Sequence, residues 1–153
     1  MNRKARFVPS DAARPEITEA LTRGVCRFLA SAGITPLREF KLANKRRCDV
    51  AGLDAAGRFT VVEVKSSVAD FRADGKWADY LAHADFFYFA VDAAFPLDLL
   101  PPVHGVLVAD GFGAALHRAA VEQPLNANRR RHQLLRFARQ AARQLDLAAD
   151  PRI

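Results

Sequence analysis

Two acidic residues and a lysine lie on consecutive predicted strands, with a spacing suited to metal-assisted cleavage of a phosphodiester. The segments Cys48–Leu53 and Phe59–Val64 are short and rich in apolar and β-branched residues, as β-strands are. Asp49 lies on the first segment, Glu63 lies on the second, and Lys65 follows two residues later. Two carboxylates and an ammonium group can together hold a divalent cation and manage the charge of a phosphoryl transition state.

The turn between the two segments determines which residues face each other. Asp54-Ala-Ala-Gly57 is typical of a hairpin turn, with Gly57 in a left-handed conformation and Asp54 opposite Arg58. This register places Asp49 directly opposite Glu63, where two like charges repel each other. A divalent cation would convert the repulsion into ligation.

Oxygen ligands that leave room for several waters suit Mg²⁺, with Mn²⁺ as the alternative. We therefore expect Asp49 and Glu63 to bind the metal. Lys65 is expected to position or deprotonate a water, or to balance charge that develops on the phosphorus.

Glu-x-Lys also occurs on ordinary surface strands, where charged residues alternate with apolar ones for solubility. Phe59 and Val61 share the predicted face of Glu63, so that face is expected to be buried, and a charge there needs a reason. A register shift of one residue would send Asp49 to the opposite face. The register is therefore the observation that separates the two interpretations.

Around these residues the chain resembles the PD-(D/E)XK nuclease superfamily, with Asp49 as the first acid and Glu63-Val64-Lys65 as the (D/E)XK motif. A longer set of segments is similar to the MmcB-like DNA repair family, from about Arg23 to the C-terminal helix. These segments are Arg46–Val50, Val62–Ser67, Asp70–Asp74, Lys76–Trp77, Asp79–Leu81, Phe86–Val91, Phe95–Pro96 and Val108–Asp110.

The resemblance implies an α/β fold with a restriction-endonuclease-like αβββαβ core, in which helices flank a mixed central sheet. To this core the chain adds a hairpin and a long C-terminal helix. The elements that the sequence predicts agree with this order. They are a helix from Pro15 to Gly33, strands at Pro36–Leu42, Cys48–Leu53, Phe59–Val64 and Phe86–Val91, helical segments after Ser67 and over Lys76–Ala84, a hairpin of Gly105–Ala109 with Ala115–Ala120, and a helix over Asn128–Ala148.

The resemblance also implies further site residues. The carbonyl of Val64 is expected as a metal ligand, and the helix after Lys65 is expected to supply a polar group, for which Lys76 is the candidate. The superfamily often adds an acid from the first helix. The candidates for this acid are Glu16 and Glu19 on that helix and Glu39 on the strand before Asp49.

Other side chains on the predicted helix after Lys65 are expected to be structural. Trp77, Tyr80 and Leu81 have a spacing that suits the core rather than a platform for stacking bases. Asp79 is expected to pair with Lys76 across one turn of the helix.

The composition favours a polyanionic partner. The formal net charge of +6 indicates nucleic acid ahead of a membrane surface. The 153 residues suit a basic arm over 1–13 and one domain over 14–150. Cys26 and Cys48 lack metal-ligand spacing, and no apolar stretch reaches the length of a membrane span, so a cytoplasmic protein with reduced thiols is expected.

Two groups of basic residues are candidates for DNA contacts. Lys45, Arg46 and Arg47 directly precede Asp49, where a backbone phosphate would approach the metal, although a solvated turn is the alternative. Arg136 and Arg139 lie on the C-terminal helix. They share a face with Arg129, His132 and Arg143, opposite an apolar stripe of Leu134, Ala138, Ala141 and Leu145.

The face with Arg136 and Arg139 has three interpretations: a surface that follows phosphates, the solvated outer face of a packed helix, or a surface for a protein partner. The function expected from all these features is DNA repair by a Mg²⁺-dependent endonuclease. Its expected partners are DNA and other DNA repair proteins. The alternatives are a nuclease-fold DNA-binding or adaptor protein without cleavage, and a restriction-type or RNA-cleaving enzyme, because one fold supports many substrates.

Overall fold

The computed structural model describes residues 14–152, and the basic arm predicted over residues 1–13 lies outside them. Within the described part, no helix is both long enough and apolar enough to cross a bilayer. The predicted order of elements is confirmed. The helical segment predicted over Lys76–Ala84 is a 3-10 helix, η2, and a short 3-10 helix, η3, is an addition. The elements are α1 (Arg14–Ser31), β1 (Thr35–Lys41), β2 (Arg47–Leu53), β3 (Phe59–Val64), α2 (Val68–Ala73), η2 (Trp77–His83), β4 (Phe86–Val91), η3 (Leu97–Leu99), β5 (Gly105–Ala109), β6 (Ala114–Arg118) and α3 (Ala127–Ala149).

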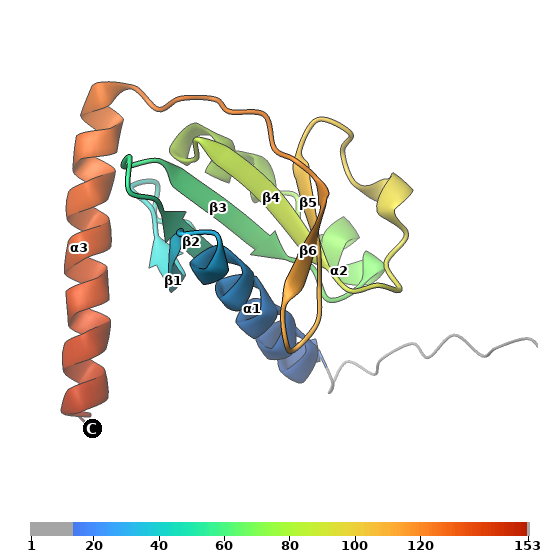
Figure 1. Cartoon of the computed structure of the whole chain (residues 1–153), viewed down its shortest axis with the longest axis horizontal. Helices are drawn as coiled ribbons and strands as arrows, with labels where there is room; N and C mark the ends of the chain where they lie inside the picture. Colours follow the sequence, from blue (N-terminus) through green and yellow to red (C-terminus); the bar gives the residue numbers. More distant parts are fainter. Residues whose placement is uncertain (1–13, 153) are drawn as a thin grey trace, which may run out of the picture.

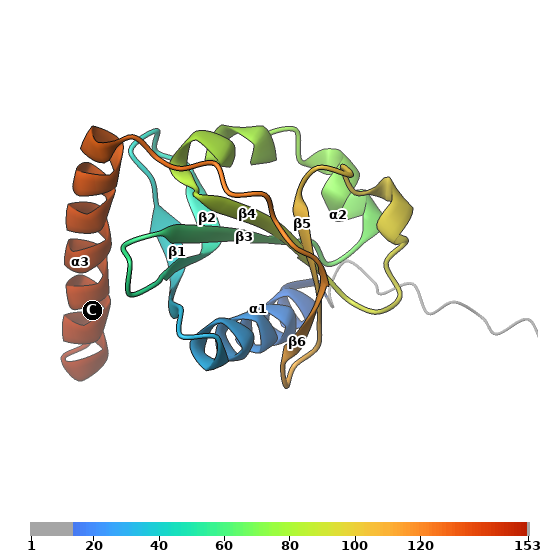
Figure 2. The ribbon, with the colours of Figure 1, turned by 45° about the horizontal axis from the view of Figure 1, so that its top comes forward.

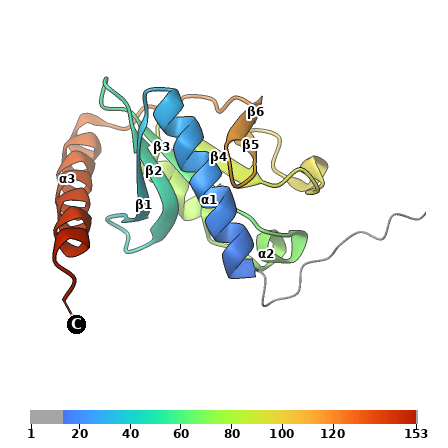
Figure 3. The ribbon, with the colours of Figure 1, turned by 60° about the horizontal axis from the view of Figure 1, so that its bottom comes forward.

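The six strands form one sheet in the order of the sequence, β1 to β6 (Figure 1). The pairs β3–β4 and β4–β5 are parallel and the other three pairs are antiparallel, so the predicted mixed sheet is confirmed. Helix α1 lies across one face of the sheet, while α2 and η2 lie on the other (Figures 2 and 3). Helix α3 stands beside β1.

The β2–β3 hairpin has the predicted register. Val50 pairs with Val62 and Leu53 pairs with Phe59. Gly57 closes the turn with a φ of 81°, which is the left-handed conformation that glycine adopts at little cost. The turn is also stabilised by the Asp54 carboxylate, which accepts the backbone N–H of position 56 and of position 58, both at 2.9 Å.

Two cores cover the two faces of the sheet. On one face, Leu21, Val25 and Leu29 of α1 pack against strand residues such as Val62. On the other face the core is aromatic. Its rings include Phe40, Phe59, Phe87, Phe89, Trp77, Tyr80 and Phe137. Trp77 contacts Phe89 with ring centroids 5.2 Å apart, so the prediction that Trp77 and Tyr80 belong to the core is confirmed.

The backbone of α1 packs tightly against the β5–β6 turn at Gly24. A Cβ atom at this position would lie 1.9 Å from the carbonyl oxygen of Asp110, so only glycine allows the contact. The neighbouring Arg23 donates from Nε to the carbonyl of Gly111 at 2.8 Å. Glycine at this position therefore holds α1 and the second hairpin together.

The segment after β3 turns sharply into α2. The Ser67 hydroxyl accepts the N–H of Asp70 at 3.0 Å, as in a capping box. The carboxylate of Asp70 returns to the N–H of Ser66 at 3.0 Å, one residue earlier than in the standard motif. Gly75 lies between α2 and η2 and separates the two helical segments.

The buried face of α3 differs from the predicted stripe. Gln133 and Phe137 are the residues of α3 that are buried, whereas Ala138 is exposed and Leu145 is 73% exposed. The reason is that polar contacts hold much of the helix. Gln133, for example, donates from Nε2 to the carbonyl of His83 at 2.7 Å.

Two further glutamines of α3 bind the outer strand β1. Gln140 accepts the N–H of Lys41 at 2.8 Å and donates to the carbonyl of the same residue at 2.7 Å. Gln144 donates to the carbonyl of Arg38 at 3.0 Å. Side chains of α3 thus take the place of a neighbouring strand along this edge, while β6 forms the opposite edge of the sheet.

Asp85 is fully buried and joins three parts of the chain. Its carboxylate accepts the N–H of Phe59 at 2.7 Å and the N–H of Leu125 at 2.9 Å. Arg130 of α3 donates to both carboxylate oxygens, at 2.9 and 2.7 Å. The start of β3, the segment before α3 and α3 itself therefore depend on one carboxylate.

We expect Asp85→Ala to lower the free energy of unfolding by about 3 to 5 kcal/mol, because it leaves Arg130 and two backbone N–H groups without their acceptor. Urea denaturation followed by circular dichroism would measure the loss. Asp98→Ala is the matched control, since Asp98 is an exposed aspartate, and it should change the value by no more than about 0.5 kcal/mol. Equal losses in the two variants would contradict this account of Asp85.

Candidate active site

Asp49 lies where the hydrogen-bonded ladders on both sides of β2 are interrupted. The β2–β3 ladder ends one residue later, at Val50. In the β1–β2 ladder, Asp49 and Glu39 do not pair, and Glu39 has a φ of 55°, which a strand residue does not normally adopt. The pairs on either side of this gap are Arg38–Val50 and Phe40–Cys48.

Carboxylates bridge the gap between β2 and β3 in both directions. Glu63 accepts the N–H of Asp49 on Oε1 at 3.0 Å, and Asp49 accepts the N–H of Val64 on Oδ2 at 2.7 Å. The two acids therefore lie next to each other, as the register predicts. One oxygen of each remains for a ligand: Oδ1 of Asp49 has no hydrogen bond within residues 14–152, and Oε2 of Glu63 lies 3.8 Å from Nζ of Lys65.

Lys65 contacts two carboxylates. Its Nζ donates to Oδ2 of Asp74, in addition to its ion pair with Glu63. Asp74 follows α2, and its other oxygen accepts the N–H of Lys76 at 2.8 Å. Sequence reasoning did not assign Asp74 to the site. The sequence offered one indication of its role: Asp74 ends the segment Asp70–Asp74, which resembles the MmcB-like family. Nothing in the sequence linked this segment to Lys65.

The pKa values of the acids report crowded negative charge. Burial and the neighbouring Asp49 raise the pKa of Glu63 to about 8. Burial also raises the pKa of Asp49, against the opposing effect of the hydrogen bond from Val64. Burial acts to raise the pKa of Asp74 as well, but the hydrogen bonds from Lys65 and from the Lys76 backbone outweigh it, so that pKa is lowered.

Two neutral side chains, Cys48 and Tyr80, lie near the acids, and the negative charge of the acids affects their pKa values as well. Burial, followed by the charge of Glu63, raises the pKa of both Cys48 and Tyr80. The Tyr80 hydroxyl donates to the carbonyl of Arg47 at 3.0 Å and so fixes the start of β2. The surroundings of Glu63 are therefore electrostatically negative, and a cation would relieve the repulsion between the acids.

The donor set fits a cation that keeps part of its water shell. Mg²⁺ is commonly bound by one or two carboxylates together with waters and phosphate oxygens, and Asp49 and Glu63 supply two adjacent carboxylates. Within residues 14–152, no three His, Cys, Asp or Glu side chains are grouped to hold a metal ion. The role predicted for the Val64 carbonyl stays a prediction.

Within residues 14–152, none of the candidates for a further acid joins Asp49 and Glu63 in a group of three metal-ligating side chains. Glu39 lies opposite Asp49 at the gap in the β1–β2 ladder. Glu19 forms an ion pair with Arg38, at 2.7 Å, on the surface of α1. Glu16 and Glu39 are exposed.

The basic connection between β1 and β2 lies directly before the acids. Lys45 and Arg47 are exposed, and Lys45 has a φ of 68°. Arg46 forms an ion pair with Asp79 at 3.0 Å. The expected pairing of Asp79 with Lys76 is therefore wrong, because Asp79 on η2 faces the β1–β2 connection.

The site is only partly open to solvent. Glu63 and Lys65 are 5% and 4% exposed, whereas Asp49 and Asp74 are half-buried. Asp49 and Asp74 are therefore the more exposed carboxylates of the site.

Comparisons with known proteins agree with this fold. No curated protein matches the chain. A solved structure, the SPO1766 protein of unknown function from Silicibacter pomeroyi, is 42% identical, with a TM-score of 0.84 over 93% of this chain and 95% of that chain. The family described as DNA repair protein MmcB-like matches residues 7–152. Because this match spans nearly the whole sequence, the chain belongs to the MmcB-like family of DNA repair proteins.

Proposed function

We propose that the protein is a Mg²⁺-dependent endonuclease that cleaves DNA during repair. The observation that carries this proposal is the adjacent pair of the half-buried Asp49 and the buried Glu63, the latter in an ion pair with the buried Lys65. A buried pair of acids is costly unless a cation or a proton compensates it. The arrangement also agrees with the order of acids and lysine in the PD-(D/E)XK superfamily.

In this function, Asp49 and Glu63 would hold the cation through the oxygens that the backbone leaves available. A bound Mg²⁺ supplies a Lewis acid for the phosphate and lowers the pKa of a water. Lys65 orients the water or the phosphate oxygen through its ammonium group. Asp74 positions Lys65, because it accepts a hydrogen bond from Nζ. Lys76 lies next to Asp74 as the candidate polar group from the next element.

The basic connection would hold the substrate. Lys45 and Arg47 are exposed and precede Asp49 by only four and two residues. A DNA backbone phosphate bound to them would therefore lie close to the acids. Arg46 is already paired with Asp79 and contributes less free charge. Such contacts position DNA without reading its sequence.

A non-cleaving DNA-binding or adaptor protein is the second candidate. It is favoured by the ion pair between Lys65 and Asp74, which occupies the ammonium group. The low exposure of Glu63 and the lack of a three-ligand group within the described residues favour it as well. Under this reading the same acids would serve stability alone.

Glu63→Gln separates the two candidates. Glutamine keeps an oxygen for the N–H of Asp49 but removes the charge, so the fold should persist. We expect Mg²⁺-dependent cleavage of a panel of single-stranded, duplex, nicked and branched DNA to fall at least about 100-fold, beyond the loss typical of an outer-shell change. Glu122→Gln, which changes an exposed glutamate outside the site, is the control and should cleave normally. Cleavage by Glu63→Gln at the wild-type rate, or none by the wild type, would reject the nuclease.

The pH dependence of the free energy of unfolding tests the repulsion between Asp49 and Glu63 without requiring catalysis. The folded pKa of Glu63 is about 8, above its ordinary value of 4.5, so folding stabilises the protonated form. The corresponding stability is present below about pH 4.5 and is lost as the pH rises through 8. In EDTA we therefore expect the wild-type free energy of unfolding to decline between these pH values.

Glu63→Gln should remove most of this decline in the free energy of unfolding. The part that remains should come from Asp49, whose pKa is also raised. Glu122→Gln should decline as the wild type does. Adding Mg²⁺ to the wild type at high pH should restore stability, because the cation replaces the proton. If the free energy of unfolding of Glu63→Gln and of the wild type changed identically with pH, the raised pKa of the Glu63 carboxylate would not be the cause of the decline.

A further inference from the structure

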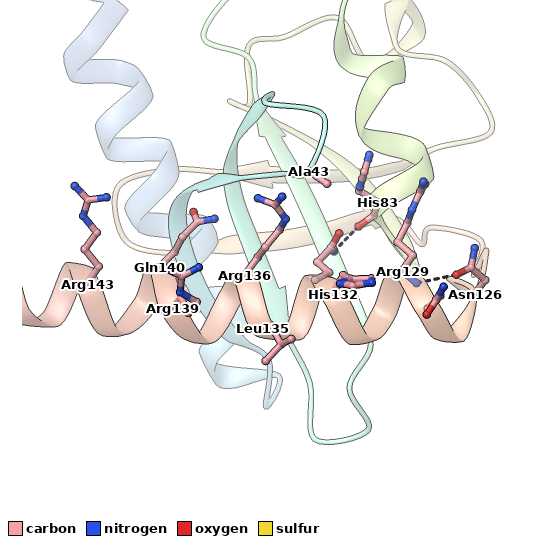
Figure 4. A pocket seen from close by; sticks show the side chains of 12 residues that line it. Ala43, His83, Asn126, Arg129, His132, Leu135, Arg136, Arg139, Gln140 and Arg143 are labelled. Carbon is pink, nitrogen blue, oxygen red and sulfur yellow. Dashed lines mark hydrogen bonds between the residues drawn. The ribbon is translucent and has the colours of Figure 1, made fainter.

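A basic groove follows helix α3 on the side of the β1–β2 connection and the end of η2 (Figure 4). Its volume is about 880 Å³, and no acidic side chain lines it. The lining residues are Ala43, His83, Asn126, Asn128, Arg129, His132, Gln133, Leu135, Arg136, Arg139, Gln140 and Arg143. We call this feature the α3 groove.

The arginines of the α3 groove form a row of charge along the helix. Arg129, Arg136 and Arg139 are followed by Arg143, and the row spans roughly 21 Å at the usual rise per residue. These four arginines are exposed and form no ion pair within residues 14–152. Of their guanidinium groups, that of Arg129 donates a hydrogen bond to the carbonyl of residue 82 at 2.8 Å. Arg130 differs, because Asp85 neutralises it. Four of the five α3 arginines that form no ion pair among the described residues therefore line the groove, and Arg131 is the exception.

His83 is a second and independent sign of a missing ligand. Its side chain lines the groove and is 6% exposed, yet Nδ1 is buried without a hydrogen-bond partner in the described part of the chain. A buried polar atom without a partner is costly in a finished structure. Burial and the nearby charge of Arg129 and Arg136 also lower the pKa of His83. An anion in the groove would offset that charge.

The α3 groove continues toward the candidate active site. An adjoining cavity of about 600 Å³ shares His83 and Arg129 with it. The adjoining cavity is also lined by Asn44, Lys45 and Arg46, the connection that leads into β2 and Asp49. Asp79 lines it as well, and its charge is paired with Arg46 at 3.0 Å. One basic path therefore runs from the C-terminal half of α3 to the residues before the acids.

The chemistry of the lining identifies the ligand. No Phe, Tyr or Trp side chain lines the groove, so it lacks the rings on which unpaired bases stack. A row of arginines without acids suits phosphates. We propose that the α3 groove binds the phosphate backbone of one DNA strand, independently of sequence, and directs it past Asn44–Arg46 to the acids. The proposal rests on the proposed function only in taking DNA as the polyanion, and it does not require cleavage.

The test measures binding of the full-length protein to a fluorescein-labelled single-stranded DNA of mixed sequence. Fluorescence anisotropy is recorded in EDTA, so that cleavage plays no part, over a series of KCl concentrations. The double variant Arg136→Ala/Arg139→Ala should bind at least about ten-fold more weakly, and the slope of log K against log salt should fall by about 1.4, at about 0.7 for each lost phosphate contact.

Three further variants make the result specific. Arg131→Ala removes an exposed arginine of the same helix that does not line the groove, and it should bind as the wild type does. Arg136→Lys/Arg139→Lys keeps the charge and should keep the salt slope. Glu122→Gln changes an exposed glutamate outside both the groove and the acids, and it should keep wild-type affinity. Because the assay is run in EDTA, failure of the nuclease proposal appears in cleavage and not in this assay.

Equal weakening by Arg131→Ala and by the double alanine variant would overturn the proposal, because net charge alone would then explain binding. Wild-type affinity in the double alanine variant would overturn it as well. So would strong binding of polyglutamate together with no binding of DNA, which would indicate an acidic protein segment as the occupant.

Discussion

The constraint on which the rest of the candidate site depends is a pair of hydrogen bonds: the Asp49 N–H donates to the Glu63 carboxylate, and the Val64 N–H donates to the Asp49 carboxylate. Where β2 and β3 part, a carboxylate from each strand replaces a carbonyl of the ladder. Backbone groups thereby fix both acids without help from flexible side chains. The cost is the proximity of two negative charges in a buried place, which only a proton, the ammonium of Lys65 or a metal ion can offset.

The part of this arrangement that follows from local chemistry could be predicted from the sequence. The turn closed by Gly57 determined the register, and the register brought Asp49 to Glu63. Asp74 could not be placed, because its contact with Lys65 depends on the path of the chain through α2. The buried face of α3 was also misjudged. Apolar periodicity describes helices that pack through hydrophobic stripes, whereas glutamines hold much of this one.

The proposed site of DNA cleavage and the proposed site of DNA binding belong to different parts of the fold. The acids and Lys65 lie at the junction of β2 and β3, whereas the row of arginines belongs to α3, more than sixty residues further along the chain. Asp85 connects the two parts, because it binds the start of β3 and Arg130 of α3. The sheet thus sets the position of the α3 groove relative to the acids, which a family of DNA repair proteins would need if bound strands are to reach them in a fixed orientation.

The glutamines that bind β1 affect how this sheet meets other molecules. Gln140 offers Lys41 the same donor and acceptor that a further strand would offer, so the backbone of β1 is unavailable to a second chain at that point. At the far side of the sheet, β6 has no such cover and carries the exposed Leu116. A further strand would therefore find free backbone groups more readily along β6 than at Lys41 of β1.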